Sequence, residues 1–182
     1  VREMEDDIEF SLTKSQIRLK SKSVDLALNI RTTEDFPPFP ERIENLMEMD
    51  ATFLLGLLSK VSFLIPQNHS NPALNGMLLE FNNNILSMVV TDGHCLAKVE
   101  TDRYPLEENK KWLLPKRAIV ELKKILENTQ TKNLFLGTCG SQLVFSGPNF
   151  NFFSKLLSDT FPQYKPILNK EGFKPASILK DE

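Results

Sequence analysis

The chain resembles itself, and this internal repeat constrains the possible folds more than any other feature of the sequence. Near the start, Ser15-Gln16-Ile17 leads through a strand-like stretch to Phe36-Pro37, and Ser15 and Phe36 are 21 residues apart. Much later, Ser141-Gln142-Leu143 leads in the same way to Phe161-Pro162, with a spacing of 20 residues. The shared order indicates copies of one structural unit. Chance similarity among β-hairpins is the alternative.

The residues that follow each Phe-Pro pair also match. A helix pattern begins at Ala51, and a similar one begins at Ala176, 125 residues later. The first residue is Val1 rather than Met, so we expect the chain to begin within a longer protein. We interpret the 182 residues as the end of one copy, one whole copy and the start of a third.

Hydrophobic periodicity within the whole copy predicts two helices and several strands. Asp50 is a suitable N-cap for the first helix, Pro66 ends that helix, and Pro115 suits the first position of the second. The predicted helices cover residues 51–64 and 115–128, and the predicted strands cover residues 45–49, 74–81, 85–91, 94–100, 112–114, 134–137, 142–146 and 150–157. The order is β-α-β-β-β twice. It predicts an α+β domain with two helices packed on antiparallel β-sheets and eight strands per repeat.

The net charge of -2 does not indicate nucleic-acid binding, so any such surface has to be local. No Asp or Glu occurs between residues 51 and 79, and the outer sides of both predicted helices carry cations: Lys60, Lys116, Arg117, Lys123 and Lys124. Side by side, the helices would form a mildly basic surface suited to sequence-independent contact with phosphates. An ordinary solvated helix face is the alternative, and the residues alone favour it.

Asp92, Gly93 and His94 occupy a predicted tight turn between two strands. An Asp/His pair is compatible with a hydrolytic enzyme, but catalysis also needs a nucleophile or a third orienting group within reach. The sequence contains no Gly-rich phosphate loop and no metal-ligand spacing around Cys95 or Cys139, so we expect no cofactor or metal and two reduced thiols. We therefore favour a structural turn, or a binding site at this turn, over a catalytic role for Asp92 and His94.

Several motifs together resemble the second domain of bacterial β sliding clamps, the β subunit of DNA polymerase III. They are Asn75-Gly76-Met77-Leu78-Leu79-Glu80, Thr91-Asp92-Gly93-His94-Cys95-Leu96-Ala97, Leu114-Pro115-Lys116-Arg117 and Phe153-Ser154-Lys155-Leu156 with Phe161-Pro162-Gln163-Tyr164. The resemblance implies the DNA clamp (processivity) fold. It also implies three parts: residues 1–43 from a first domain, 44–168 as the complete second domain, and 169–182 opening a third.

What the resemblance implies about function is a mechanism without bond chemistry. Two three-domain subunits would form a homodimeric, head-to-tail ring around duplex DNA in the cytoplasm, with helices lining the hole. The ring would tether the polymerase and bind the clamp loader through short peptides, with no membrane contact. The cations named above would then face DNA.

The resemblance also implies a hydrophobic peptide-binding cleft and a subunit contact. The second-domain wall of the cleft is expected at Leu74, Thr91, Gly93, His94, Leu96, Pro162 and Ile167. Plain core packing is the alternative for Leu74, Leu96 and Ile167. Cys95 and Pro166 stand where many relatives carry basic residues, so peptide selectivity is expected to differ. Leu26 is expected on the strand edge that meets another subunit.

Overall fold

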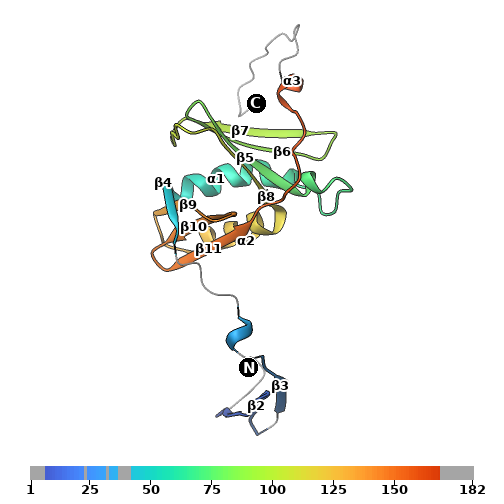
Figure 1. The fold of residues 1–182 in the computed structure, drawn as a ribbon, viewed down its shortest axis with the longest axis vertical. Helices are drawn as coiled ribbons and strands as arrows, with labels where there is room; N and C mark the ends of the chain where they lie inside the picture. The colour runs from blue at the N-terminus through green and yellow to red at the C-terminus, as the bar shows by residue number, and fades with distance from the viewer. Residues whose placement is uncertain (1–6, 23, 32, 37–41, 169–182) are drawn as a thin grey trace, which may run out of the picture. The chain divides into compact units, whose positions relative to one another are not determined.

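The computed structural model describes residues 7–22, 24–31, 33–36 and 42–168 and divides the chain into two units, Val1–Glu41 and Arg42–Glu182 (Figure 1). The division falls close to the first boundary expected from the sequence, after residue 43. The expected start of a third domain, residues 169–182, lies outside the described residues. Each unit is described by itself below.

The first unit contains a three-stranded antiparallel sheet in the order β1-β2-β3. Its elements are β1 (Glu9–Leu12), β2 (Gln16–Lys20), β3 (Asp25–Asn29) and a short 3-10 helix, η1 (Thr33–Asp35). Arg18 on β2 forms two hydrogen bonds of 2.6 Å with the carboxylate of Asp25 on β3. This cross-strand ion pair is exposed, so it contributes little to stability.

The second unit contains eight strands and two long helices among its described residues. Its elements, in order, are β4 (Glu44–Asp50), α1 (Ala51–Val61), η2 (Ser62–Leu64), η3 (Pro72–Asn75), β5 (Gly76–Asn82), β6 (Ile85–Thr91), β7 (Leu96–Thr101), β8 (Lys110–Pro115), α2 (Lys116–Asn128), β9 (Asn133–Cys139), β10 (Gln142–Gly147), β11 (Phe150–Lys155) and the single turn α3 (Lys165–Leu168). The α+β class and the doubled β-α-β-β-β order predicted from the sequence are both confirmed. None of the described helices is long and apolar enough to cross a membrane.

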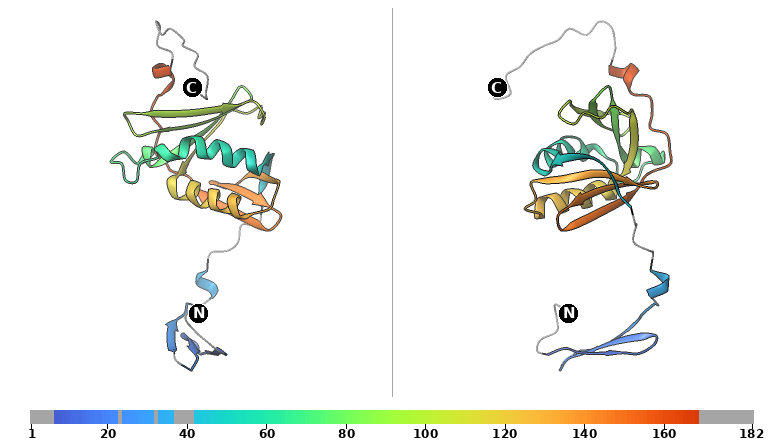
Figure 2. Two further views of the ribbon diagram at one scale, coloured as in Figure 1. Left: turned by 180° about the vertical axis from the view of Figure 1, so that it is seen from behind. Right: turned by 60° about the vertical axis from the view of Figure 1, so that its left-hand side comes forward.

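The two halves of this unit exchange their first strands. The first half is β4-α1-β5-β6-β7 and the second is β8-α2-β9-β10-β11. One sheet has the order β11-β10-β9-β4 and the other has the order β7-β6-β5-β8, so each sheet holds three strands of one half and the first strand of the other. All pairings are antiparallel. Figure 2 shows α1 and α2 side by side, with the strands of both sheets packed against them.

A single apolar core joins both helices to both sheets. The helix positions that face it repeat every three or four residues and are fully or nearly buried: Leu54, Leu57, Leu58 and Val61 on α1, and Ala118, Ile119, Leu122 and Leu126 on α2. Strand residues alternate, so Met77, Leu79 and Phe81 of β5 face the same core. Burial of this amphipathic pattern is the main reason why the sequence adopts these elements.

Several predicted element boundaries were wrong, as three examples show. The first helix changes to a 3-10 turn after Val61 instead of continuing to Leu64. Pro115 is the extended residue before α2 rather than its first residue, because it pairs with Gly76 as the last residue of β8. The strand predicted from residue 74 begins only at Gly76. The side chain of Asn71 accepts a hydrogen bond from the amide of Ala73 and so caps a 3-10 helix over Pro72–Asn75.

A second, smaller cluster lies on the face of the β5–β8 sheet that points away from the helices. This outer cluster consists of Ala73, Leu78, Val89, Leu113 and Tyr164. Residues 156–164, which we call the strap, cross this face after β11, and Leu157 and Phe161 of the strap pack on the cluster. The sheet is therefore covered on both sides, which explains the nearly continuous apolar sequence of β5 and β6.

Candidate functional site

The two helices are joined at one end by lysine side chains. The Lys116 ammonium, in the first turn of α2, donates a 2.9 Å hydrogen bond to the main-chain carbonyl of Ile65. The Lys123 ammonium, two turns later, donates a 3.2 Å hydrogen bond to the hydroxyl of Ser62, the C-cap of α1. The two side chains therefore reach across from α2 to the C-terminal end of α1, where the helix dipole favours positive charge.

A groove of about 200 Å³ separates these helix ends. Its lining is mostly lysine and aliphatic side chains: Ser62, Ile65, Lys116, Ile119, Val120, Lys123, Lys124 and Glu127. Lys124 also forms an exposed 3.2 Å ion pair with Glu121, and Arg117 is exposed. The structure thus brings four of the five predicted cations onto one helix, beside the end of the other.

Lys60 is placed differently from the other four. It lines a shallow hollow on a different part of α1, together with Thr52, Gly56 and Arg103. Arg103, in the loop after β7, lies 4.7 Å above the ring of Phe53 and forms a 3.3 Å ion pair with Asp50, the N-cap of α1. Arg103 was not among the predicted residues, and no local pattern indicates it, because its partner Asp50 at the start of α1 is 53 residues away in the chain.

The Asp92 carboxylate forms the turn between β6 and β7. Its Oδ1 accepts the main-chain amides of His94 at 2.9 Å and Cys95 at 2.7 Å, and these bonds hold the pKa of Asp92 below its usual value. Gly93 has a φ of 89°, which a residue with a side chain rarely adopts. The hydroxyl of Thr91 closes the turn by donating to the carbonyl of Cys95 at 2.6 Å. This geometry explains Asp92 as a turn residue and leaves the His94 side chain exposed.

The predicted cleft residues come from separate segments of the second unit. Leu74 on η3 and Thr91 at the end of β6 are buried, and Leu96 at the start of β7 is half-buried against the outer cluster. Gly93, His94 and Pro162 are exposed. Ile167 on α3 is 55% exposed, so it is not a core residue of the described part of the chain, whereas Leu74 at 4% is.

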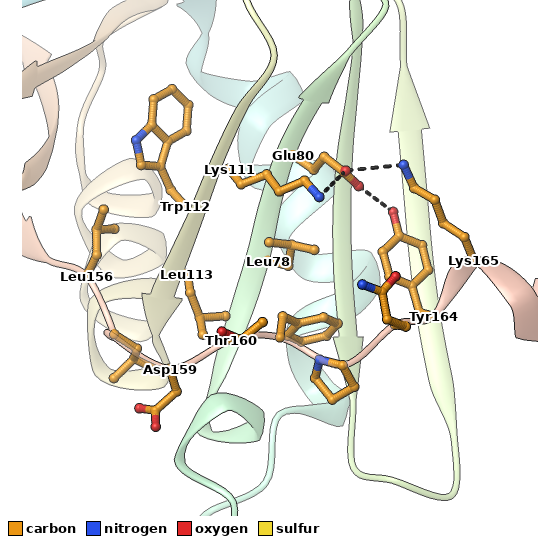
Figure 3. Close-up of a pocket in the computed structure, with 14 residues that line it drawn as sticks. Leu78, Glu80, Lys111, Trp112, Leu113, Leu156, Asp159, Thr160, Tyr164 and Lys165 are labelled. Atoms are coloured by element: carbon orange, nitrogen blue, oxygen red, sulfur yellow. Dashed lines mark hydrogen bonds and ion pairs between the residues drawn. The ribbon is translucent and has the colours of Figure 1, made fainter.

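A hollow of about 420 Å³ opens along the strap on the same sheet face (Figure 3). It is lined by β5, β8 and strap residues and includes Pro162 from the predicted cleft, but none of the other six residues predicted there. This hollow was not predicted from the sequence. A charged residue, Glu80, in the middle of the apolar run of β5 was the signal for it.

Glu80 is 2% exposed and accepts hydrogen bonds from three side chains. Tyr164 donates at 2.6 Å, Lys111 lies at 3.1 Å, and Lys165 donates at 3.2 Å (Figure 3). Burial alone would raise the pKa of Glu80, but these three donors outweigh it and hold the pKa below its usual value. Burial and the adjacent carboxylate raise the pKa of the Tyr164 hydroxyl.

Leu26 lies in the first unit, on β3, at the edge of the three-stranded sheet. It is 41% exposed, and Leu28 on the same strand is also exposed. An edge strand with exposed apolar residues has unpaired main-chain groups available for another strand. Both cysteines are free thiols, and the described residues contain no group of three His, Cys, Asp or Glu side chains that could hold a metal ion.

Comparisons with known proteins agree with this architecture. The crystal structure of the DNA polymerase III subunit beta from Pseudomonas aeruginosa superimposes with a TM-score of 0.76 at 27% identity, covering 94% of this chain and 48% of that one. The beta subunit of Thermotoga maritima gives a TM-score of 0.72 at 26% identity, covering 92% and 45%. The doubled β-α-β-β-β unit therefore has the DNA clamp fold.

Sequence comparison leads to the family. The protein-family model described as "DNA polymerase III beta subunit, central domain" matches residues 48–163. The Beta sliding clamp of Pseudomonas aeruginosa is 29% identical over 170 residues, 92% of this chain and 46% of that protein. The Beta sliding clamp of Haemophilus influenzae is 29% identical over 199 residues, 100% of this chain and 54% of that protein. The chain belongs to the DNA polymerase III beta subunit family and spans about half the length of the relatives it matches.

Proposed function

We propose that the chain is part of a non-catalytic DNA sliding clamp. In the complete protein, two copies close head to tail into a ring around duplex DNA in the cytoplasm. The ring tethers the replicative polymerase and binds the clamp loader. In this proposal α1 and α2 face the DNA, residues 44–168 form the second domain, and Leu26 belongs to the contact between subunits.

The single observation that carries the DNA role is the placement of Lys116 and Lys123 across the groove to the end of α1. Each ammonium has three donors and uses one of them in this contact, so the others remain available for phosphate oxygens. Lys116 and Arg117 also occupy the first turn of α2, where the helix dipole disfavours cations and favours anions. Two cations at that position serve helix stability poorly and suit phosphate binding well.

Titration of the chain with a short DNA duplex tests this proposal by NMR chemical shifts, which detect weak binding. We expect the amides of the first two turns of α2 to shift, and the binding constant to fall as salt concentration rises. Replacing Lys116 and Lys123 with Glu should reduce the salt dependence by about 0.9 in log-log slope for each phosphate that the variant no longer neutralises.

Lys155→Glu is the matched control for this experiment. Lys155 is exposed at the end of β11, whose inward side chains Phe150 and Phe152 pack on the core, so it points away from the helices. Arg117→Glu adds a variant at an exposed position. If both helix variants bind DNA with the wild-type salt dependence, α2 does not face DNA and the proposal is wrong.

We further propose that Leu74, Thr91, Gly93, His94, Leu96, Pro162 and Ile167 form one wall of a cleft for short apolar peptides. Support comes from the exposure of Ile167 and Pro162 and the partial exposure of Leu96, because a mostly apolar surface with a few polar groups suits peptide capture. His94→Ala should weaken the binding of a Leu- and Phe-containing peptide. Phe135→Ala, at an exposed position on β9, is the control.

The same His94 variant discriminates the clamp from the hydrolytic alternative based on Asp92 and His94. A clamp loses peptide affinity and has no turnover to lose, whereas a hydrolase loses turnover. Asp92 is occupied by two main-chain amides of its own turn, and the relatives named above are clamps. We therefore propose no hydrolytic activity.

A further inference from the structure

Glu80 is an unusual residue for the middle of a covered strand. Its neighbours on β5, Leu79 and Phe81, point into the main core, while Glu80 and Leu78 point toward the strap. A buried carboxylate is costly to maintain unless its partners compensate for the water that it loses. The identity of those partners therefore indicates what the charge does.

Two of the three partners of Glu80 come from one short stretch of chain. Tyr164 ends the strap, and Lys165 begins α3; both side chains reach the same carboxylate. Tyr164 is 5% exposed, its ring packs edge-on against Phe161 at 6.3 Å, and the ammonium of Lys98 lies 5.8 Å from its centre. The end of the strap is thus held at a defined point of the sheet.

The other end of the strap is also attached to the sheet. The amide of Leu157 donates a 2.9 Å hydrogen bond to the carbonyl of Leu113 on β8, and the Leu157 side chain packs on the outer cluster. Within the strap, Pro162 comes two residues before Tyr164. Ile167 follows three residues after it, and its amide donates a 3.0 Å hydrogen bond to the carbonyl of Tyr164. Any movement of Tyr164 relative to β5 therefore moves Pro162 and Ile167.

We propose that Glu80 is a positioning residue for the peptide cleft: its hydrogen bond to Tyr164 and its ion pair with Lys165 fix Pro162 and Ile167 in register with Leu74 and Leu96 of the same wall. This inference rests on the proposed peptide-binding function. Glu80 touches no peptide itself; it acts by holding the two parts of this wall in register with each other.

The chemistry explains why this position requires a carboxylate. Both Glu80 oxygens accept hydrogen bonds, one from Tyr164 and the other from the two lysines. In Glu80→Gln, the amide NH2 would replace one of these acceptors and face either a hydroxyl donor or two ammonium groups. The substitution conserves shape. It removes the negative charge from the contacts with Lys111 and Lys165, and where the NH2 faces Tyr164, the hydroxyl keeps a hydrogen bond only if it turns to accept from the amide NH2. Tyr164→Phe removes only the hydroxyl and keeps the ring packing.

The test measures the affinity of the chain for a Leu- and Phe-containing peptide by NMR titration, together with hydrogen exchange at the amides of Leu157 and Ile167. We expect Glu80→Gln and Tyr164→Phe each to weaken peptide binding about tenfold, as for the loss of one charge-assisted hydrogen bond. The double variant should be little worse than Glu80→Gln alone, because Tyr164→Phe removes only one of the contacts that Glu80→Gln already alters. Exchange at Ile167 should accelerate.

Ser87→Ala is the matched control. Ser87 is buried on the same sheet face and donates a 2.8 Å hydrogen bond to Glu100, but neither residue belongs to the strap. This variant should retain wild-type peptide affinity. If Ser87→Ala weakens peptide binding as much as Glu80→Gln does, a general loss of stability explains the weaker binding. The positioning role is then overturned.

Two further outcomes separate the inference from the function beneath it. If the wild-type chain binds the peptide and the Glu80→Gln and Tyr164→Phe variants bind it equally well, the positioning role is wrong, but the proposed cleft still stands. If His94→Ala and Ile167→Ala leave peptide affinity unchanged as well, the peptide contacts another surface. The cleft and the inference then fail together.

Discussion

The ammonium of Lys116 donates a hydrogen bond of 2.9 Å to the main-chain carbonyl of Ile65, a residue from the segment that follows α1. Ile65 is 4% exposed, so its carbonyl has little access to solvent, and the lysine satisfies it from the neighbouring helix. One side chain thus has two roles, since it joins the helix ends and keeps a positive charge at the groove. Mutation of Lys116 tests the structural role, with the neighbouring exposed cation Arg117 for comparison.

Replacing Lys116 with Met removes the structural role together with the charge. We expect the free energy of unfolding to fall by about 1–2 kcal/mol, because the Ile65 carbonyl loses its partner. Urea denaturation followed by circular dichroism measures this change. Arg117→Met, at the next and exposed position, should alter stability by no more than about 0.5 kcal/mol. Equal losses from the two variants would contradict a structural role for Lys116.

Two glycines make a matched pair with opposite expected effects. A Cβ atom at Gly76 would lie 2.3 Å from the carbonyl oxygen of Leu114 and 2.9 Å from the Leu157 side chain. Gly76→Ala should therefore destabilise the second unit by about 1–3 kcal/mol, since the clash is with a paired strand. A Cβ atom at Gly56, inside α1, meets nothing within 4 Å, so Gly56→Ala should stabilise by about 1 kcal/mol. Thermal unfolding of the two variants should shift in opposite directions.

The N-cap of α1 gives a third prediction. Asp50 accepts the amide of Phe53 at 2.8 Å, so Asp50→Ala should cost about 1 kcal/mol of stability. Asp50→Asn keeps a capping oxygen and should restore most of this loss, although the ion pair with Arg103 is gone. Urea midpoints of the two variants distinguish the cap from the ion pair. An Asn variant as unstable as the Ala variant would assign the effect to Arg103.

Low pH should weaken the contacts of Glu80 with Tyr164, Lys165 and Lys111. The pKa of Glu80 is lower in the folded protein than its usual value, so its contribution to stability is complete above the unfolded-state value of about 4.3. It is lost as pH falls through the folded-state pKa. Comparison of wild type with Glu80→Gln by urea denaturation at several pH values should show the largest difference at neutral pH. A stability difference that stays constant down to pH 3 would mean that Glu80 does not titrate as described.

The periodic part of the fold was accessible from the sequence. Each predicted helix and strand in residues 44–155 exists, because every one of them buries a face whose spacing the residues display. The turn at Gly93 was also accessible, since it depends on local chemistry. The start of β5 was not, because the Asn71 cap at Ala73 competes with the strand pattern of the following residues.

The long-range contacts of the candidate site were not accessible in this way. Glu80 and Tyr164 are 84 residues apart, and nothing in either segment identifies the other as its partner. The same holds for Arg103, whose contacts with α1 depend on how β7 passes that helix. The resemblance to clamps supplied candidate residues, but it did not indicate that Glu80 binds Tyr164 and Lys165.

The pairing of β4 with β9 and of β5 with β8 has a consequence for how the second unit behaves as a whole. Neither half owns a complete sheet, because the outermost strand of each is supplied by the other. Unfolding of one half therefore removes three strands of one sheet and the edge strand of the other. Such a unit is expected to lose its structure in one cooperative event.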